Sequence, residues 1–181
     1  MPPTAMPFTD VVRARRSVRN FLPPLSPSDI RGVLEDAQRA PSNCDTQPWT
    51  VHVVSGATRD GLSKEIRKAD DEGRFSYDFT FDYADFGEGI HLDRAHHHAA
   101  TLTQATGLKR EDRTARKAAA REGLMFFGAP HVAFLFMPAF GDGVRAAGDI
   151  GMYGQNFLLS GRSRVRRRPD DHARLLRRHH P

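Results

Sequence analysis

The sequence predicts one domain that mixes helices and strands, of the α+β or the α/β class. Only two short runs have the composition of strands, whereas longer segments around them have helical patterns, so helices outnumber strands. The chain has 181 residues, of which 39% are hydrophobic, and this is enough to bury a sizeable core. No apolar run approaches the ~18 residues of a membrane span, and the first ten residues lack the pattern of a signal peptide. We therefore expect no membrane as a partner.

The first two predicted helices lie before residue 41. Thr9 is placed to cap a short helix from Asp10 to about Arg15. The second helix has a clear start, with Ser26 as N-cap, Pro27 at the first helical position and Asp29 as a capping-box partner. Its apolar residues recur at i, i+3, i+4 and i+7 and predict one buried stripe: Ile30, Val33, Leu34 and Ala37.

Two runs predict strands. The run TVHVV at residues 50–54 is β-branched, which is typical of a strand. The run HVAFLFM at residues 131–137 is apolar on both faces, so we expect this strand to be central in its sheet. After it, residues 144–159 are apolar almost all round, which predicts a helix buried by the rest of the fold or by a second subunit.

The segment between the two strands is predicted to be mostly helical. We expect one helix from Gly56 to about Asp71 and two more at 92–106 and 112–123. Residues 72–90 are rich in glycine, aspartate and aromatic residues, and they predict a long surface excursion.

The positive charge of the chain is concentrated at its end. Residues 160–181 hold eight of the 27 basic and two of the 22 acidic residues, which leaves 19 basic against 20 acidic residues elsewhere. A face that binds nucleic acid is normally built into the domain itself, so we do not expect nucleic acid as a partner. A basic-tailed nucleic-acid-binding protein is the alternative, and its binding would fall steeply with salt.

Several signatures of common enzyme classes are absent from the sequence. It contains no GxxxxGK[ST], GxGxxG, GxSxG or HExxH motif, which argues against simple nucleoside triphosphatases, Rossmann dehydrogenases, esterases and zincins. Cys44 is the single cysteine, which excludes an internal disulfide and favours a reducing, cytoplasmic location. The histidine run 96–98 has no partner at i+4, so we expect no metal site.

The cluster Arg15-Arg16-Ser17-Val18-Arg19 is a candidate oxyanion clamp. Three guanidinium groups and one hydroxyl lie within five residues, next to the end of a predicted helix. Arginine binds phosphate through paired hydrogen bonds, and serine adds a neutral donor. The alternative is a solvated basic turn, because exposed runs of charge are common.

The segment APSNCDTQPW at residues 40–49 is the second candidate. It joins a predicted helix to a predicted strand, and its two prolines restrict the backbone around side chains that form hydrogen bonds. A flat heteroaromatic ring with polar edges would suit such a loop. The alternative is an ordinary turn between a helix and a strand.

Taken together, RRSVRNF at 15–21 and APSNCDTQPW at 40–49 closely resemble the flavin-dependent nitroreductase family. Residues 149–159 are similar to the family's central helix, written D-x-G-x-x-x-Q-N-x-x-L. The resemblance covers about residues 8–159. The segment at 107–113 is similar to the branch of the family that acts on nitroaromatics and related compounds.

The resemblance implies an α+β, nitroreductase-like fold, with a central, mostly antiparallel sheet flanked by helices and FMN at a dimer interface. It implies a homodimer in which NADH or NADPH reduces the flavin. A small-molecule electron acceptor, such as a nitroaromatic or a quinone, would then replace the nicotinamide in a ping-pong order. Because the flavin carries the hydride chemistry, we expect no catalytic side chain.

The resemblance also implies two groups of FMN contacts. The phosphate and ribityl chain would be bound by Arg15, Arg16 and Ser17, and the pyrimidine edge would lie near Arg19. The ring would be lined from the neighbouring subunit by Ser42, Asn43 and Gln47. Asp45 stands where the family usually has asparagine, and an ionised carboxylate only accepts hydrogen bonds.

Residues 160–181 match nothing in the family, which continues with further helix and strands. We therefore expect a nitroreductase-like domain at 8–159 whose C-terminal strand region is missing, and a basic, disordered tail at 160–181. A frameshift in the gene or its record is one hypothesis for this tail. The corresponding alternative for function is a truncated, non-catalytic remnant of the family with weak or no FMN binding.

Overall fold

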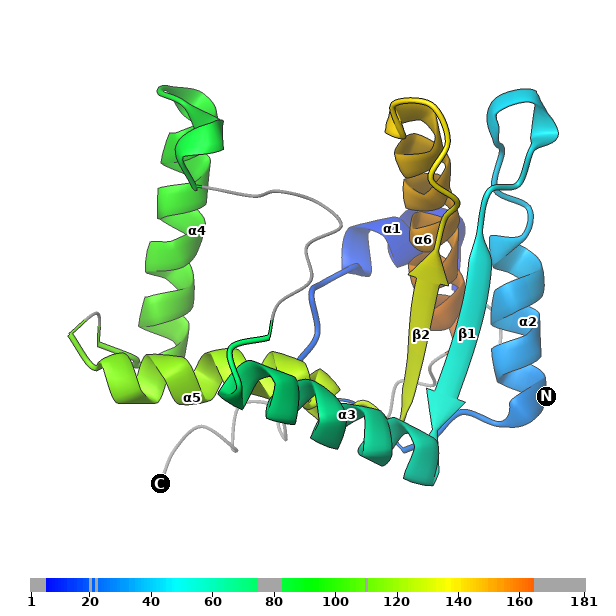
Figure 1. The fold of residues 1–181 in the computed structure, drawn as a ribbon. Helices are drawn as coiled ribbons and strands as arrows, with labels where there is room; N and C mark the ends of the chain where they lie inside the picture. The colour runs from blue at the N-terminus through cyan, green and yellow to red at the C-terminus, as the bar shows by residue number, and fades with distance from the viewer. Residues whose placement is uncertain (1–5, 20, 22, 75–82, 110, 165–181) are drawn as a thin grey trace. The chain divides into compact units, whose positions relative to one another are not determined.

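The computed structural model describes residues 6–19, 21, 23–74, 83–109 and 111–164. Their elements follow the expected order (Figure 1). The helices and strands are α1 (Phe8–Ala14), α2 (Pro27–Ala37), β1 (Thr50–Ser55), α3 (Gly56–Asp71), α4 (Ile90–Thr106), α5 (Arg113–Leu124), β2 (His131–Phe136) and α6 (Val144–Arg164). Short 3-10 turns occupy Asn43–Asp45, Tyr83–Phe86 and Phe126–Gly128. Helices outnumber strands in the described part of the chain, as predicted.

The chain divides into two compact units. The first contains the described residues up to 59 and those from 129 to 164, and the second contains the described residues from 60 to 128. The first unit carries the two strands, α1, α2 and α6, and therefore both sequence segments that resemble flavin contacts.

In the first unit, β1 and β2 form an antiparallel pair. Thr50 lies opposite Phe136 and Ser55 lies opposite His131. The predicted central position of β2 is not observed, because among the described residues the sheet has only these two strands. Residues 131–135 are nevertheless partly buried on both faces of β2, as its apolar sequence predicts.

Helix α2 begins as predicted, because its capping interactions are local. The backbone N–H of Asp29 donates to Ser26 Oγ (3.1 Å), and that hydroxyl donates to the Asp29 carboxylate (2.7 Å). Pro27 occupies the first turn, and Val33 and Ala37 of the predicted stripe are buried.

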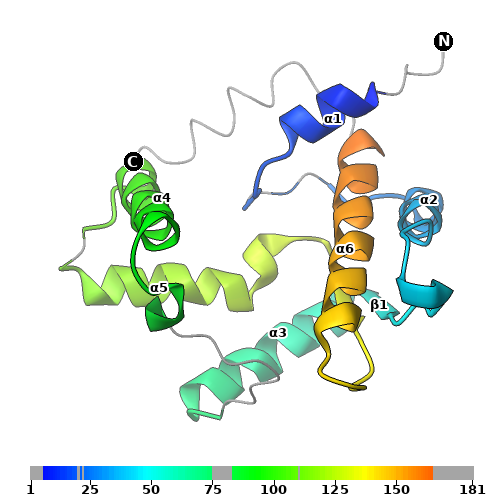
Figure 2. The same ribbon diagram turned by 90° about the horizontal axis from the view of Figure 1, so that it is seen from above.

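Helix α1 does not begin as predicted. It starts at Phe8, and Thr9 lies inside the helix rather than capping it. The carbonyl oxygen of Pro7 accepts from the N–H groups of both Asp10 and Val11, each at 3.0 Å, and so closes the first turn earlier. Val11 is buried, and α1 packs against α6. Figure 2 shows α1 beside the C-terminal end of α6.

Helix α6 is longer than predicted. It continues to Arg164, so residues 160–164 are helical and do not belong to the predicted disordered tail. The physical reason lies in α2, where Asp36 accepts hydrogen bonds from the buried Ser160 hydroxyl and from Arg164 Nη2, the latter at 2.8 Å. Gly32 leaves space for this guanidinium, since a Cβ there would lie 2.7 Å from it. Residues 165–181 of the predicted tail lie outside the described residues.

The core of the first unit joins α2, β1, β2 and α6. Its centre is formed by Ala37, Ala40 and Tyr153, and Tyr153 is only 2% exposed. Four partly buried side chains pack against this centre: Trp49, Val51, Leu135 and Phe157. The rings of Trp49 and Tyr153 have centroids 5.1 Å apart, and burial raises the pKa of the Tyr153 hydroxyl. The residue directly after the 42–48 loop is thereby packed against α6.

The second unit contains most of α3, together with α4 and α5. The buried Ser63 hydroxyl donates to the carbonyl of Leu124, which joins α3 to the end of α5. Arg121 forms ion pairs with Asp70 and Asp71, and its hydrogen bonds lower the pKa of the Asp71 carboxyl. Of the predicted excursion at 72–90, residues 75–82 lie outside the described residues.

Replacing the shared acceptor between α2 and α6 should destabilise the fold. Asp36→Ala leaves the buried Ser160 hydroxyl and Arg164 without their carboxylate. We expect a loss of about 1 kcal/mol in the free energy of unfolding at pH 7, at the low end because Asp36 is half exposed. Urea unfolding measures this loss. The exposed neighbour substitution Glu35→Ala serves as the control, and an equal effect of both would contradict the interpretation.

The same variant predicts a pH dependence. The Ser160 hydroxyl, and after it Arg164, lowers the pKa of Asp36 below its ordinary value of 3.8. A lowered folded-state pKa stabilises the fold above the unfolded-state pKa, and this stabilisation is lost as the pH falls through the folded-state value. The difference between the native chain and Asp36→Ala should therefore shrink below pH 3.8.

Candidate functional site

The 42–48 loop has an unusual backbone held by its own side chains. Cys44, Asp45 and Gln47 have φ values of 52°, 54° and 46°, a region that residues other than glycine rarely adopt. The N–H of Gln47 donates to Ser42 Oγ (2.9 Å). Thr46 Oγ1 donates to the carbonyl of Asn43 (2.9 Å). These bonds close the loop on itself and offset the strain of the left-handed residues.

Gln38, the residue directly after α2, holds the end of the loop. Gln38 Nε2 donates to Gln47 Oε1 (2.7 Å), and Trp49 Nε1 donates to Gln38 Oε1 (3.0 Å). Gln47 Nε2 in turn donates to Asp45 Oδ1 (3.0 Å). Both polar atoms of the Gln47 carboxamide therefore form hydrogen bonds within the chain, and its contact with the flavin ring stays a prediction.

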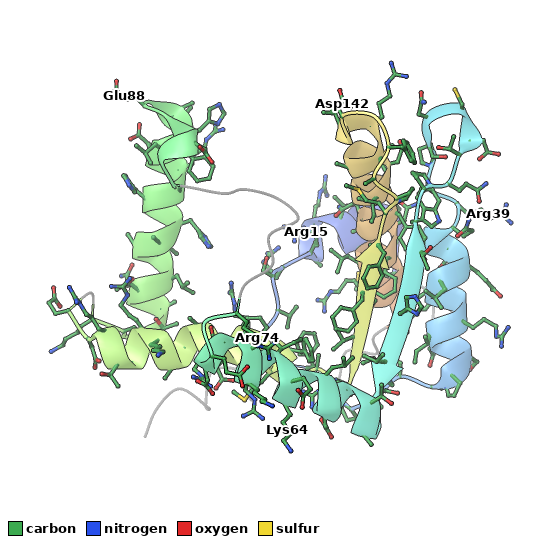
Figure 3. The ribbon with its side chains drawn as sticks, in the orientation of Figure 1. Arg15, Arg39, Lys64, Arg74, Glu88 and Asp142 are labelled. Atoms are coloured by element: carbon green, nitrogen blue, oxygen red, sulfur yellow. The ribbon has the colours of Figure 1, made fainter. Side chains whose placement is uncertain are left out.

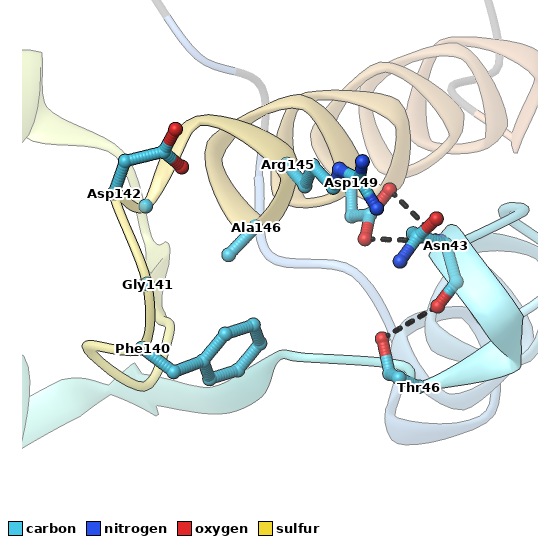
Figure 4. Close-up of a pocket in the computed structure, with 9 residues that line it drawn as sticks. Asn43, Thr46, Phe140, Gly141, Asp142, Arg145, Ala146 and Asp149 are labelled. Carbon is cyan, nitrogen blue, oxygen red and sulfur yellow. Dashed lines mark hydrogen bonds between the residues drawn. The ribbon is translucent and has the colours of Figure 1, made fainter.

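Helix α6 holds the start of the loop. The backbone N–H of Asn43 donates to both carboxylate oxygens of Asp149, at 3.2 and 3.1 Å (Figure 4). Asp149 is only 5% exposed. The sequence placed Asp149 in a helix motif without assigning it this contact. The signal that marks it is that Asp149 is the single acidic residue of α6.

A pocket of about 350 Å³ opens between this loop and the start of α6. Its walls include Asn43 and Thr46 from the loop, Phe140 and Asp142 from the turn before α6, and Arg145 from the first turn of α6 (Figure 4). A second hollow, of about 440 Å³, shares Thr46 and Phe140 and continues along the aromatic end of the β1–β2 pair. The loop is thus accessible to a ligand on the side that bears Asn43.

The Arg-rich segment follows α1 directly. Arg15 caps the C-terminus of α1, and Arg16 Nη1 donates to the carbonyls of Arg13 and Arg15, both at 2.8 Å. The side chains of Arg15, Arg16, Ser17 and Arg19 are all exposed. Within the part of the chain that the structure describes, Arg15 and Ser17 use no side-chain atom in a hydrogen bond. These donors are therefore available to a ligand.

The Arg-rich segment and the 42–48 loop lie on different parts of the first unit. The loop contacts Asp149 near the start of α6, whereas α1 lies beside the C-terminal end of that helix (Figure 2). Figure 3 shows Arg15 next to α1, away from the loop that precedes β1. In one copy of the chain the Arg-rich segment and the 42–48 loop therefore lie apart.

Other kinds of site find no support among the described residues. No group of three or more histidine, cysteine, aspartate or glutamate side chains is arranged to hold a metal ion in those ranges. None of the helices in those ranges has both the length and the apolar composition of a membrane span.

The model of the Nitroreductase family matches residues 12–164. The chain is 40% identical over 151 residues to Nitroreductase NfnB of Mycolicibacterium smegmatis, a match that covers 83% of this chain and 64% of NfnB. It is 35% identical over 166 residues to 4-nitrobenzoate reductase of a Nocardioides species, covering 90% of this chain and 67% of that relative. The chain thus spans less than two thirds of the length of NfnB.

Solved structures show the same likeness. The crystal structure of the FMN-dependent nitroreductase NfnB from Mycobacterium smegmatis in complex with NADPH aligns with a TM-score of 0.79 at 38% identity, over 84% of this chain and 68% of that one. An FMN- and NADPH-dependent NfnB from Sphigopyxis sp. strain HMH aligns with a TM-score of 0.76 at 28% identity, over 86% and 70%. These alignments confirm the expected nitroreductase-like α+β fold.

Removing the side chain that joins Trp49 to Gln47 should loosen the loop. In Gln38→Ala, both residues lose a hydrogen-bond partner, so we expect faster amide hydrogen exchange at residues 43–47 and a red shift in the fluorescence of the single tryptophan. The loss of stability should be about 1 kcal/mol. Arg39→Ala, at the next and exposed position, is the matched control. Unchanged exchange in Gln38→Ala would show that the loop does not depend on this contact.

Proposed function

The chain belongs to the nitroreductase family, and from this membership we propose that it is an FMN-dependent NAD(P)H oxidoreductase. Its acceptors would be nitroaromatic compounds, quinones or similar small molecules. The single observation that carries the proposal is the pair of exposed half-sites, one rich in phosphate-binding donors and one built as a polar loop beside a pocket.

The Arg-rich segment fits the phosphate end of FMN. Arg15 and Ser17 have unused donors, and Arg16 spends only Nη1 on backbone carbonyls, so its remaining N–H groups are available. Paired hydrogen bonds from guanidinium groups match the geometry of a phosphate. Arg19, near the pyrimidine edge of the ring, would place a positive charge where the reduced flavin is negative.

The loop fits the polar edge of the flavin ring. Within the described ranges, the exposed carboxamide of Asn43 makes no hydrogen bond, so it has both a donor and an acceptor to offer. Ser42 Oγ already accepts from the N–H of Gln47 and still has a proton to donate. Gln47 and Asp45 are hydrogen-bonded to each other, so they would support the loop, and Ser42 and Asn43 would make the main contacts with the ring.

Bound FMN would supply the redox chemistry, taking a hydride from NADPH or NADH and passing it to the acceptor in a ping-pong order. The side chains of this protein would bind and orient the cofactor and leave the pocket beside Phe140 open to the second reactant. No acid or base from the chain is needed for that role, which agrees with the absence of a catalytic constellation in the sequence.

We further propose that the chain acts as a homodimer. Because one copy presents the two half-sites on different parts of its first unit, a complete flavin site would combine the Arg-rich segment of one copy with the loop of the other. Exposed apolar side chains on α1 and α6 would be covered by such an association: Phe8, Val12, Val144, Met152 and Leu158. We also propose a cytoplasmic location, because the single cysteine is a free thiol and forms no disulfide.

Removing two phosphate-binding side chains should abolish tight FMN binding. In Arg15→Ala/Arg16→Ala, each lost charge-assisted bond costs about 1.5 kcal/mol or more, so we expect the Kd for FMN to rise about 100-fold. Fluorescence titration of FMN measures the Kd. Arg31→Ala/Arg39→Ala removes the same charge from exposed positions on α2 and just after it, and it should leave the Kd unchanged.

Two results would contradict the proposal. One is an unchanged FMN affinity in the Arg15/Arg16 variant. The other is a native chain that neither acquires a flavin absorbance nor bleaches on addition of NADPH, which would favour the non-catalytic remnant instead.

A further inference from the structure

Asp149 is a buried carboxylate in an unusual setting. It is 5% exposed, and among the described residues it forms no ion pair. Its hydrogen-bond donor there is a single backbone group, the N–H of Asn43, which is shared between the two carboxylate oxygens. Burying a charge without a cation is costly, and an apolar residue of similar size often stabilises a fold as well or better. General stability is therefore a poor explanation for this carboxylate.

The position that Asp149 holds is the more informative feature. The main chain of Asn43 is restrained on both sides, because its N–H binds Asp149 and its carbonyl accepts from Thr46 Oγ1 (2.9 Å) and from the N–H of Thr46 (3.1 Å). Its carboxamide remains exposed and lines the pocket of about 350 Å³. The backbone is fixed while the side chain stays available.

We propose that Asp149 is a positioning residue: its carboxylate fixes the backbone of Asn43 so that the Asn43 carboxamide is presented to the flavin. The inference rests on the proposed function, since it assumes that the pocket-lining carboxamide contacts FMN. A carboxylate accepts this N–H through both of its oxygens, and because it donates no proton when ionised, it occupies no acceptor atom of the loop.

Asp36 provides a matched comparison within the same molecule. Its carboxylate also joins α6 to an element that packs against it, but it accepts from Ser160 and Arg164 and not from a residue of the loop. Removing Asp36 should weaken the packing of α2 on α6 without moving Asn43. A purely structural role of Asp149 would make the two substitutions equivalent in their effect on the cofactor.

The experiment measures the Kd for FMN in the full chain for Asp149→Leu, Asp149→Asn, Asn43→Ala, the Asp149→Leu/Asn43→Ala pair and Asp36→Leu. We expect the Kd to rise about tenfold in Asp149→Leu and in Asn43→Ala, the effect of one lost hydrogen bond. The pair should be no worse than Asn43→Ala alone, because Asp149 acts through that residue. Asp149→Asn keeps an acceptor oxygen and should restore most of the affinity.

Controls separate positioning from loss of structure. Circular dichroism melting shows which variants are folded, and Asp149→Ala replaces Asp149→Leu if the latter does not fold. Asp36→Leu should lower Tm while keeping the Kd within about twofold of the native value, because distant sites contribute independently.

Three results would overturn the inference while leaving the proposed function intact: native affinity in a folded Asp149→Leu, multiplication of the two single effects in the pair, or an equal loss of affinity in Asp36→Leu. A native chain that does not bind FMN would instead overturn the proposed function, and the inference with it.

Discussion

The position of the 42–48 loop depends on one contact between distant parts of the chain: the backbone N–H of Asn43 donates to the buried carboxylate of Asp149. It joins the segment between α2 and β1 to the start of α6, across 106 residues of sequence. Asp36 makes the second connection, to the end of α6, and the aromatic pair Trp49 and Tyr153 fills the space between. The loop is therefore part of the same packed body as α6.

This arrangement explains how a polar loop with three left-handed residues can be ordered at the surface. Each such residue costs of the order of 1 kcal/mol of conformational free energy. Hydrogen bonds that involve the side chains of Ser42, Thr46, Asp149 and Gln38 offset this cost. These bonds use the backbone and the Gln47 side chain. They leave the Asn43 carboxamide exposed at a pocket, which is the property a ligand-binding loop requires.

The sequence predicted best those features whose causes are local. The start of α2 follows from Ser26, Pro27 and Asp29, which lie within four positions of one another, and β1 and β2 follow from runs of β-branched and apolar residues. The Thr9 cap was wrong because the carbonyl of Pro7 closes the first turn of α1 instead. The prediction that α6 ends near residue 159 was wrong because Ser160 and Arg164 donate hydrogen bonds to Asp36. Asp36 is distant along the chain, so no local sequence pattern indicates this contact.

The candidate site shows the same division. Motifs identified the Arg-rich segment and the 40–49 segment, and the comparisons confirm the family they resemble. Two hydrogen bonds of the loop could not be predicted from the sequence: the one from Gln38 to Gln47 and the one from Asn43 to Asp149. In each case the two residues belong to no common helical or strand pattern. The assignment of individual contacts to FMN stays a prediction.

We propose a flavin site that combines segments from two copies of the chain. The sharing of the site between two copies can be measured by mixing subunits that carry Arg15→Ala/Arg16→Ala with subunits that carry Asn43→Ala, after dissociation and reassociation. In a symmetric dimer, half of the assemblies would be mixed and each would contain one intact site, so we expect about a quarter of the sites to regain native FMN affinity. If the mixture binds FMN no better than its two components, the two segments do not form a site across a dimer interface.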